Sequence, residues 1–422
     1  MATWTAEVFE NEYLADGGTD VHAIVTVTCA GAGQAGDTGG AAEAIIIDCS
    51  GSMDYPPDKI VAARQAAAAA IEELADGTFF AVIAGGGRAA LIYPTDGSPM
   101  AVASDQTRAA GIEAVGQLIA AGGTAISTWL TLASQLFAAV PATQRHAIML
   151  TDGKDEGEAP GVLQQTIQGV TGQFQCDCRG VGEDWNVTEL RSISTALLGS
   201  VDLIADPAEM AADFREMMRT AMGRGVADAR LRVWAPQGAE LQFVRQVAPT
   251  IDDLTDRRTP VSDLVAEFPT GSWGDESRDY HVAVRVGAKP IGSEQLAARV
   301  QLVVGGEVVT QGLVRATWSD DATLTTRINP AVAHYTGQAE LADAIQEGLA
   351  AKAAGDDESA TYKLGRAAQL AAATGNEEAT SKLKKVVDIE DADTGTVRLK
   401  RDVSKLDEMA LDTSSTKTTR VR

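Results

Sequence analysis

Three side chains that carry oxygen donors follow one short apolar stretch at alternate positions. The run 44–47, Ala-Ile-Ile-Ile, stops at Asp48, and Ser50 and Ser52 come next. A β-branched run of this length predicts a buried parallel strand, and open α/β sheets bind their ligands beyond the C-terminal ends of such strands. Carboxylate and hydroxyl oxygens are hard donors. The stretch therefore predicts a site for a hard cation such as Mg²⁺.

Two more oxygen donors occupy comparable positions further along the chain. Thr124 follows two glycines just before a predicted helix, and Asp152 ends the predicted strand 146–151. In a doubly wound sheet the first strand and the strand after the crossover lie side by side. We therefore expect Thr124 and Asp152 to meet the first three donors at one edge of the sheet. Taken singly, each of these residues could instead cap a helix.

The five residues together resemble the metal-ion-dependent adhesion site of von Willebrand factor type A domains. The resemblance covers roughly residues 43–220 and rests on Asp-Cys-Ser-Gly-Ser at 48–52, Gly-Thr at 123–124 and Thr-Asp-Gly at 151–153. It implies a divalent ion, usually Mg²⁺, with Mn²⁺ or Ca²⁺ as alternatives. Ser50, Ser52 and Thr124 would bind it directly, and Asp48 and Asp152 directly or through water.

The resemblance also implies the mode of action. An open position on the ion would accept an Asp or Glu side chain from a protein partner, which makes the chain an adaptor and not an enzyme. By analogy with bacterial relatives, candidate partners are an AAA+ ATPase of the MoxR type, a Ser/Thr kinase and a forkhead-associated protein. Two alternatives stay open, a metal-assisted phosphohydrolase and a structural protein with a vestigial site.

The elements that must position these residues alternate between strand and helix. Apolar runs and amphipathic stretches succeed one another from about residue 41 to residue 224, a rhythm that predicts a mostly parallel sheet with helices on both faces. The runs 78–84 and 89–93 are too close for a crossover helix and predict a hairpin with an antiparallel edge strand.

The rest of the sequence predicts a second structural part that supports this domain. Short alternating runs between 226 and 328 predict an antiparallel β-sandwich, and strands at 3–14 and 20–29 would complete it, with the α/β domain inserted between them. An Ala-rich helical segment and a flexible tail would follow. The predicted parts are strands and linker 1–40, the α/β domain 41–224, the sandwich 225–328, the helical segment 329–388 and the tail 389–422.

The tail suggests a point of regulation. Residues 412–422 are rich in threonine and serine and end with basic residues. The pattern resembles the exposed threonine tails that bacterial Ser/Thr kinases phosphorylate. We therefore expect phosphorylation within 413–419, where a phosphate would add charge and three acceptor oxygens.

Composition narrows the class of protein. The net charge of −24 disfavours nucleic acid and anionic membranes as partners, and no apolar run reaches eighteen residues. The N-terminus lacks the pattern of a secretory signal. Four cysteines in 422 residues do not form a disulfide framework, so we expect a cytoplasmic protein in which Cys176 and Cys178 are buried thiols on a strand.

The sequence gives weaker evidence for the other candidate sites. The sequence Gly-Gly-Gly-Arg at 85–88 lacks the Lys-Ser/Thr of a phosphate-binding loop. His22, His146 and His281 fall in strand patterns, and we expect no catalytic or zinc role for them. Acidic residues near the site are expected to be a solvated rim; these are Asp54, Asp155, Glu156 and Glu158.

Overall fold

The computed structural model describes residues 2–32 and 40–420 of the chain. They form two compact units, one made of Met1–Gly31 with Asp228–Arg422 and the other of Ala32–Ala227. The α/β domain is thus inserted between the N-terminal strands and the rest of the sandwich, as predicted. Residues 33–39 of the expected linker lie outside the described residues. Within the described ranges, no helix is both long and apolar enough to cross a membrane.

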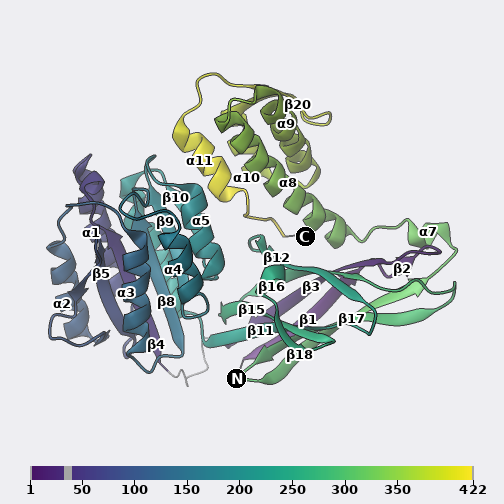
Figure 1. Cartoon of the computed structure of the whole chain (residues 1–422), viewed down its shortest axis with the longest axis horizontal. Coiled ribbons are helices and arrows are strands. Elements are labelled where there is room, and N and C mark those ends of the chain that lie inside the picture. Colours follow the sequence, from purple (N-terminus) through teal and green to yellow (C-terminus); the bar gives the residue numbers. More distant parts are fainter. Residues whose placement is uncertain (1, 33–39, 421–422) are drawn as a thin grey trace. The chain divides into compact units, whose positions relative to one another are not determined.

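The Ala32–Ala227 unit is built on a seven-stranded sheet (Figure 1). Its strand order is β10-β9-β8-β4-β5-β6, with β7 also paired to β5. The pairs among β10, β9, β8, β4 and β5 are parallel, whereas β6 and β7 are antiparallel to β5, which confirms the predicted hairpin. The strands are β4 (Ala41–Asp48), β5 (Phe79–Gly85), β6 (Ala90–Tyr93), β7 (Ala101–Val102), β8 (Gln144–Thr151), β9 (Gln175–Val181) and β10 (Val201–Ile204).

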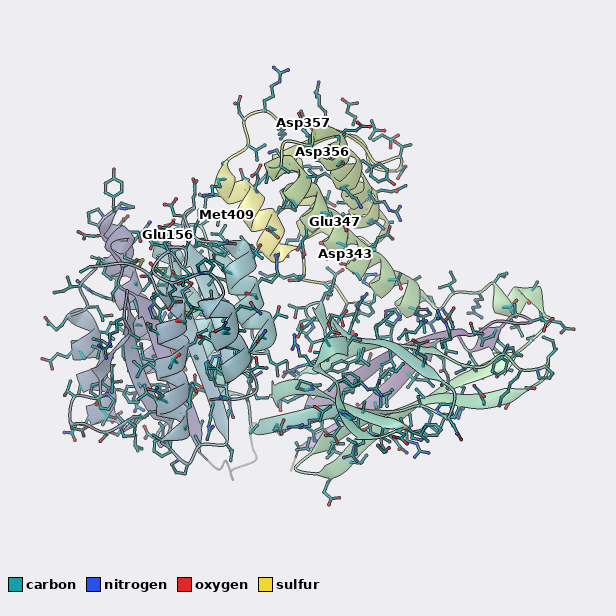
Figure 2. All side chains as sticks on the ribbon, viewed as in Figure 1. Glu156, Asp343, Glu347, Asp356, Asp357 and Met409 are labelled. Carbon is teal, nitrogen blue, oxygen red and sulfur yellow. The ribbon has the colours of Figure 1, made fainter. Side chains whose placement is uncertain are left out.

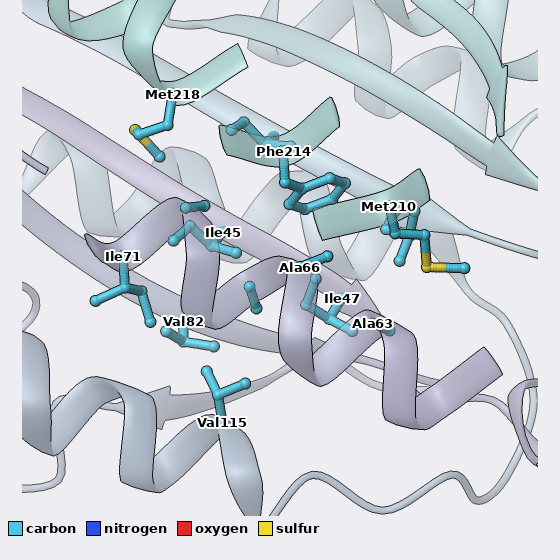
Figure 3. Packing of buried hydrophobic residues seen from close by; sticks show 14 of the residues in the cluster. Ile45, Ile47, Ala63, Ala66, Ile71, Val82, Val115, Met210, Phe214 and Met218 are labelled. Atoms are coloured by element: carbon cyan, nitrogen blue, oxygen red, sulfur yellow. The ribbon is translucent and has the colours of Figure 1, made fainter. Parts of the chain in front are cut away.

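Helices cover both faces of this sheet (Figure 1). The helices on one face pack with the side chains of Ile45 and Ile47, and Figure 3 shows this core. Both residues are fully buried, as is Ile46 between them. Burial of β4 on both faces explains the continuous apolar run at 44–47. A large apolar side chain buried in this way contributes about 1.5–3 kcal/mol to folding. The helices are α1 (Asp58–Glu72), α2 (Asp105–Gly116) and α6 (Met210–Met222) on this face, and α3 (Ile126–Ala138), α4 (Val162–Val170) and α5 (Val187–Ala196).

The second unit contains the predicted sandwich, which consists of two mostly antiparallel sheets. One has the order β1-β3-β16-β12-β13 and the other β14-β15-β11-β17-β18-β2. The first sheet contains β1 (Thr3–Glu10), β3 (Asp20–Ala30), β12 (Glu240–Ala248), β13 (Asp252–Asp253) and β16 (Ser277–Arg285). The second contains β2 (Tyr13–Leu14), β11 (Val226–Trp234), β14 (Thr259–Ser262), β15 (Val265–Trp273), β17 (Glu294–Val304) and β18 (Glu307–Trp318).

The expected single strand 3–14 is wrong in one respect. It breaks after Glu10, and β2 joins the other sheet, parallel to β18. The break allows the Asn11 side chain to accept a hydrogen bond of 2.7 Å from the backbone nitrogen of Asn329, just before the helical segment. The N-terminal segment therefore contributes to both sheets of the sandwich.

The helical segment follows the sandwich and has a small core of its own. Its helices are α7 (Ala322–Thr325), α8 (Pro330–Ala353), α9 (Asp357–Ala373) and α10 (Glu377–Val386). The first turns of α8 pack against the sandwich, where Val332 and Tyr335 lie in one buried cluster with Ile24. The Tyr335 hydroxyl also donates a hydrogen bond to the buried carboxylate of Asp279.

The prediction of a flexible tail at 389–422 is wrong for the part that the structure describes. The strands β19 (Val387–Asp391) and β20 (Thr396–Leu399) form a hairpin, and α11 (Lys405–Ser414) follows. Leu411 is fully buried in the core of the helical segment, and Met409 (Figure 2), also on α11, is almost fully buried. Residues 415–418 then run beside the sandwich, where the backbone nitrogen of Ile251 donates to the carbonyl of Thr416 at 2.8 Å. A small number of buried apolar side chains is therefore enough to hold this segment in an ordered structure.

Candidate metal centre

All five predicted site residues lie at the edge of the sheet where β4 and β8 end. Asp48 is the last residue of β4, and Asp152 directly follows β8, its parallel neighbour. Ser50 and Ser52 lie at and within the short 3₁₀ helix η2 (Gly51–Asp54), and Thr124 stands two residues before α3. Three loops thus bring their oxygen donors to one edge, as the sequence predicts for a doubly wound sheet.

Hydrogen bonds join the donors of different loops. Ser50 Oγ lies 2.9 Å from Ser52 Oγ, and Ser52 Oγ donates to Asp152 Oδ1 at 2.6 Å. The first loop and the end of β8 are thereby connected through one hydroxyl. A hydroxyl that donates to a carboxylate keeps its lone pairs, so Ser52 can still offer one to a cation.

Thr124 completes the cluster from the third loop. A methyl group built on Gly153 would lie 3.2 Å from Thr124 Oγ1, 3.8 Å from Ser52 Oγ and 4.0 Å from Asp48 Oδ2. Oxygens of two loops, from Asp48 and Ser52 in one and Thr124 in the other, therefore lie around one point beside Gly153. The absence of a side chain at Gly153 keeps that point open.

Backbone contacts hold the loops in place. The nitrogen of Gly51 donates to the carbonyl of Gly122 at 2.9 Å, and the nitrogen of Ala121 donates to the carbonyl of Cys49 at 2.6 Å. The helix that starts after Thr124 is anchored by Trp129, whose indole nitrogen donates to the Gly86 carbonyl at 2.8 Å. A Cβ atom at Gly85 would lie only 2.6 Å from that indole ring. Gly85 thus permits the close packing of Trp129, and with it α3, against the end of β5.

Asp48 is fully buried and accepts hydrogen bonds through both carboxylate oxygens. Its Oδ1 accepts from the backbone nitrogen of Ser50 at 2.7 Å, and its Oδ2 from Thr151 Oγ1 at 2.6 Å. Burial raises the pKa of Asp48, and the nearby carboxylate of Asp152 raises it further, although these hydrogen bonds oppose the change. Two buried carboxylates so close to each other favour a bound cation.

One residue of the site is not among those predicted from the sequence. Lys59, in the first turn of α1, donates through Nζ to Asp152 Oδ2 at 2.8 Å, and only 10% of its side chain is exposed. The signal was its helical spacing with the buried residues Ala63 and Ala66, which places a lysine at a core-facing position. A buried lysine is expected to have a charged partner.

The donor set fits a hard divalent cation. Three hydroxyls and two carboxylates gather there, all oxygen donors, which Mg²⁺, Mn²⁺ and Ca²⁺ prefer. Across residues 2–32 and 40–420, no three His, Cys, Asp or Glu side chains form a metal-binding group. A metal held here would accordingly depend on the hydroxyls of Ser50, Ser52 and Thr124.

Two of the acidic residues expected as a solvated rim instead cap α3. Asp155 Oδ1 accepts from the backbone nitrogen of Ile126 at 3.2 Å, and a Glu158 oxygen accepts from that of Ser127 at 3.3 Å. Burial and the Glu158 carboxylate raise the pKa of Asp155 to about 6. Asp54 and Glu156 (Figure 2) are exposed, as expected of a rim.

The other candidate residues lie away from this edge. His146 stands five residues before the end of β8, about 17 Å from it at a strand rise of about 3.3 Å per residue. His22 and His281 lie on sandwich strands, with Nδ1 and Nε2 3.1 Å apart. Cys176 and Cys178 are buried thiols on β9, as predicted.

Comparison with known proteins agrees with this architecture. Residues 44–154 match the von Willebrand factor type A domain model, and residues 369–415 match the von Willebrand factor type A C-terminal domain model. The second match spans α11 and much of the segment expected to be a flexible tail. Among curated protein sequences, none matches the chain.

Solved structures extend the likeness to the whole chain. A von Willebrand factor type A protein from Catenulispora acidiphila is 50% identical over 99% of this chain and 97% of that chain, with a TM-score of 0.94. The ArnB paralog VWA2 from Sulfolobus acidocaldarius shares the fold at 15% identity, with a TM-score of 0.58 and 98% of each chain covered. Human COPII-coat protein Sec24c is similar in fold at 10% identity, with a TM-score of 0.55 over 90% of this chain and 57% of that chain. On the identity and coverage of the first of these, the chain belongs to the von Willebrand factor type A family.

Proposed function

We propose that this protein is an adaptor that binds an acidic side chain of a protein partner through a divalent cation held at the candidate metal centre. The observation that supports it most is a cluster of oxygen donors: Asp48, Ser52 and Thr124 lie around one open point, and hydrogen bonds join Ser50 and Asp152 to Ser52. Ser50, Ser52 and Thr124 would hold the cation directly, and Asp48 and Asp152 directly or through water. When bound, the cation supplies a Lewis-acidic position for an oxygen ligand.

Exposed apolar side chains beside the site would add contact area. Tyr55 is 83% exposed, and its backbone nitrogen donates to the Ser52 carbonyl at 3.0 Å. Ile119 is 74% exposed and lies two residues before Ala121, which is bonded to Cys49. Large side chains exposed in this way are frequent anchors of protein interfaces. We propose that the partner's carboxylate is flanked by apolar residues that contact both side chains.

The proposal assigns no catalysis to the site. Hydrolysis at a metal centre generally needs a positioned base, and each histidine of the described chain lies outside the cluster of site residues. We therefore propose an interaction module and not a phosphohydrolase. Turnover of phosphoesters that is lost in Asp152→Ala would contradict this assignment.

The partner, the ion and the setting belong to the same proposal. We propose a protein partner that supplies Asp or Glu, with a MoxR-type AAA+ ATPase, a Ser/Thr kinase and a forkhead-associated protein as candidates. We propose Mg²⁺ as the ion, because an all-oxygen site suits it. Buried free thiols at all four cysteines are compatible with a reducing, cytoplasmic setting.

Regulation by phosphorylation is proposed for the end of the chain only. Thr413 is buried in α11, where its hydroxyl donates to the Met409 carbonyl at 2.9 Å, so a kinase could reach it only after local unfolding. Thr419 is exposed and lies beside Arg420. Mass spectrometry after incubation with the host's kinases tests this idea, and a tail without phosphate would refute it.

Affinity purification tests the adaptor function. A partner captured in Mg²⁺ should be lost on adding EDTA, and also with Asp48→Ala or Thr124→Ala, because each change removes the cation or one of its ligands. The exposed-residue variant Lys154→Gln serves as a control and should retain the partner. A partner that stays bound under all three treatments, with the variants folded by circular dichroism, would contradict the proposal.

A further inference from the structure

Lys59 places a positive charge inside the candidate metal centre. Its ammonium group bonds to one oxygen of Asp152 while Ser52 bonds to the other, and the Asp152 side chain is fully buried. The Lys59 ammonium also lies against Gly182, since a Cβ atom there would be 3.7 Å from Nζ. The first residue after β9 is thus in contact with the lysine of the ion pair.

This position is unfavourable for a lysine in two ways. A cation in the first turn of a helix opposes the helix dipole, and a buried ammonium loses its hydration. The other buried residues of α1 are apolar, among them Ile60 and Ala63. The Asp152 carboxylate offsets these costs, and Lys59 in turn changes the charge of the site.

The charges of the buried groups show what Lys59 changes. Asp48 and Asp152 contribute two negative charges, and Lys59 cancels one of them. A divalent cation at the site would therefore leave one positive charge in excess, which one incoming carboxylate would neutralise. Without Lys59 the two aspartates would neutralise the cation by themselves, and a partner's carboxylate would gain less on binding.

We propose that Lys59 sets the charge of the centre, weakening its hold on the divalent cation so that the bound cation keeps its attraction for an external carboxylate. The inference rests on the proposed function and makes Lys59 a positioning residue, since it acts through Asp152. In the absence of a cation, the ammonium serves as the counter-charge of Asp152. A divalent cation that binds at the site then becomes a second positively charged group close to Lys59.

Mn²⁺ titration of Lys59→Gln tests this inference. Glutamine removes the charge but can still donate a hydrogen bond to Asp152. We expect the variant to bind Mn²⁺ at least about tenfold more tightly than the wild type, because a close like charge has been removed. The free Mn²⁺ signal in electron paramagnetic resonance gives the dissociation constant. Lys154→Gln removes a nearby but exposed charge and should change it by less than about twofold, since water and salt screen that charge.

The outcomes separate this inference from the proposed function. The wild type and a folded Lys59→Gln variant are compared. If both bind Mn²⁺ and the variant binds it no more tightly, the role of Lys59 is overturned and the metal site stands. Absence of Mn²⁺ binding in both proteins overturns both proposals. Binding by the variant alone supports the role of Lys59 and contradicts the metal-dependent adaptor.

Folding and a carboxylate probe give two further readouts. A Lys59→Gln protein that unfolds without metal should fold in millimolar Mn²⁺, because the metal then replaces the missing counter-charge; a protein that stays unfolded overturns the inference. With Mn²⁺ bound, sodium acetate should bind more weakly to the variant than to the wild type, as measured by water-proton relaxation. Equal or tighter acetate binding to the variant would contradict it.

Discussion

Replacing His146 by leucine is expected to lower the free energy of unfolding of the Ala32–Ala227 unit by about 3–5 kcal/mol. The imidazole lies between two carboxylates, with Nδ1 2.7 Å from Glu43 Oε2 and Nε2 2.9 Å from Asp177 Oδ2. All three side chains are buried. Loss of the ring would leave the buried carboxylate of Glu43 without its charged partner. The cost in stability should fall mainly on Glu43, since its other oxygen has no hydrogen-bond partner among the described residues.

Urea unfolding followed by tryptophan fluorescence measures this effect, because Trp129 and Trp185 are buried in the same unit. The double variant Glu43→Leu/His146→Leu is the control. It removes the stranded carboxylate as well, so it should lose less stability than His146→Leu alone. A loss below about 1 kcal/mol in the single variant would contradict the account of this network.

The same network predicts a dependence on pH. Burial opposes the charged ring, but the carboxylates of Glu43 and Asp177 outweigh it and raise the pKa of His146 from its ordinary 6.5 to about 9. A raised pKa means that this contribution is fully present below about pH 6.5 and is lost as the pH rises through about 9. The wild type should therefore lose stability between these values, and His146→Leu should lack that part of the change.

Truncation before Ser404 is expected to destabilise the helical segment by several kcal/mol. It removes the side chains of Met409 and Leu411 from the core, each contributing about 1.5–3 kcal/mol by burial. It also removes the ion pair of Glu408 with Lys352 and the 2.9 Å hydrogen bond from Gln346 to Ser415. A flexible tail, in contrast, would be lost without effect.

Limited proteolysis and thermal unfolding measure the truncated protein. Cleavage should begin within α8–α10 while the Ala32–Ala227 unit stays resistant. Two single variants of the full chain measure the contribution of side-chain packing alone. Leu411→Ala should lower the free energy of unfolding by about 2–5 kcal/mol. Lys405→Ala, exposed on the same helix, should change it by no more than about 0.5 kcal/mol. A truncated protein as stable as the full chain would contradict the observed packing.

The sequence was sufficient to predict the five oxygen donors because each lies where a predicted strand ends or shortly before a predicted helix begins. Neighbouring parallel strands end at the same edge, so Asp48 and Asp152 converge whatever the detailed packing. The apolar run before Asp48 likewise predicts a strand buried on both faces. These features need only local patterns and the rule for where open sheets bind ligands.

Lys59 and the His146 network depend on information that local patterns lack. The spacing of Lys59 with Ala63 and Ala66 indicates a core-facing position, but it does not reveal that Asp152 is the charged partner of the lysine. His146 is paired directly with Glu43 through the register of β4 and β8. That register and the order of strands in the sheet are tertiary properties, so the sequence showed a histidine on a strand but not its partners.

The order of residues 389–420 was missed for a different reason. The segment is polar, which is typical of disorder, and its packing residues are few and widely spaced. Two local signals pointed the other way. Ser404 caps α11 by accepting from the backbone nitrogen of Asp407, and Gly395, with φ of 70°, closes the turn between β19 and β20.

Calorimetric titration of the full chain with Mg²⁺ measures directly whether the metal centre binds a cation. We expect the wild type to bind one Mg²⁺ per chain. Thr124→Ala removes a neutral ligand without altering the charge of the site, and it should lose this binding while remaining folded. Absence of binding to the wild type at millimolar Mg²⁺ and Mn²⁺, or unchanged binding to Thr124→Ala, would contradict the existence of this metal centre.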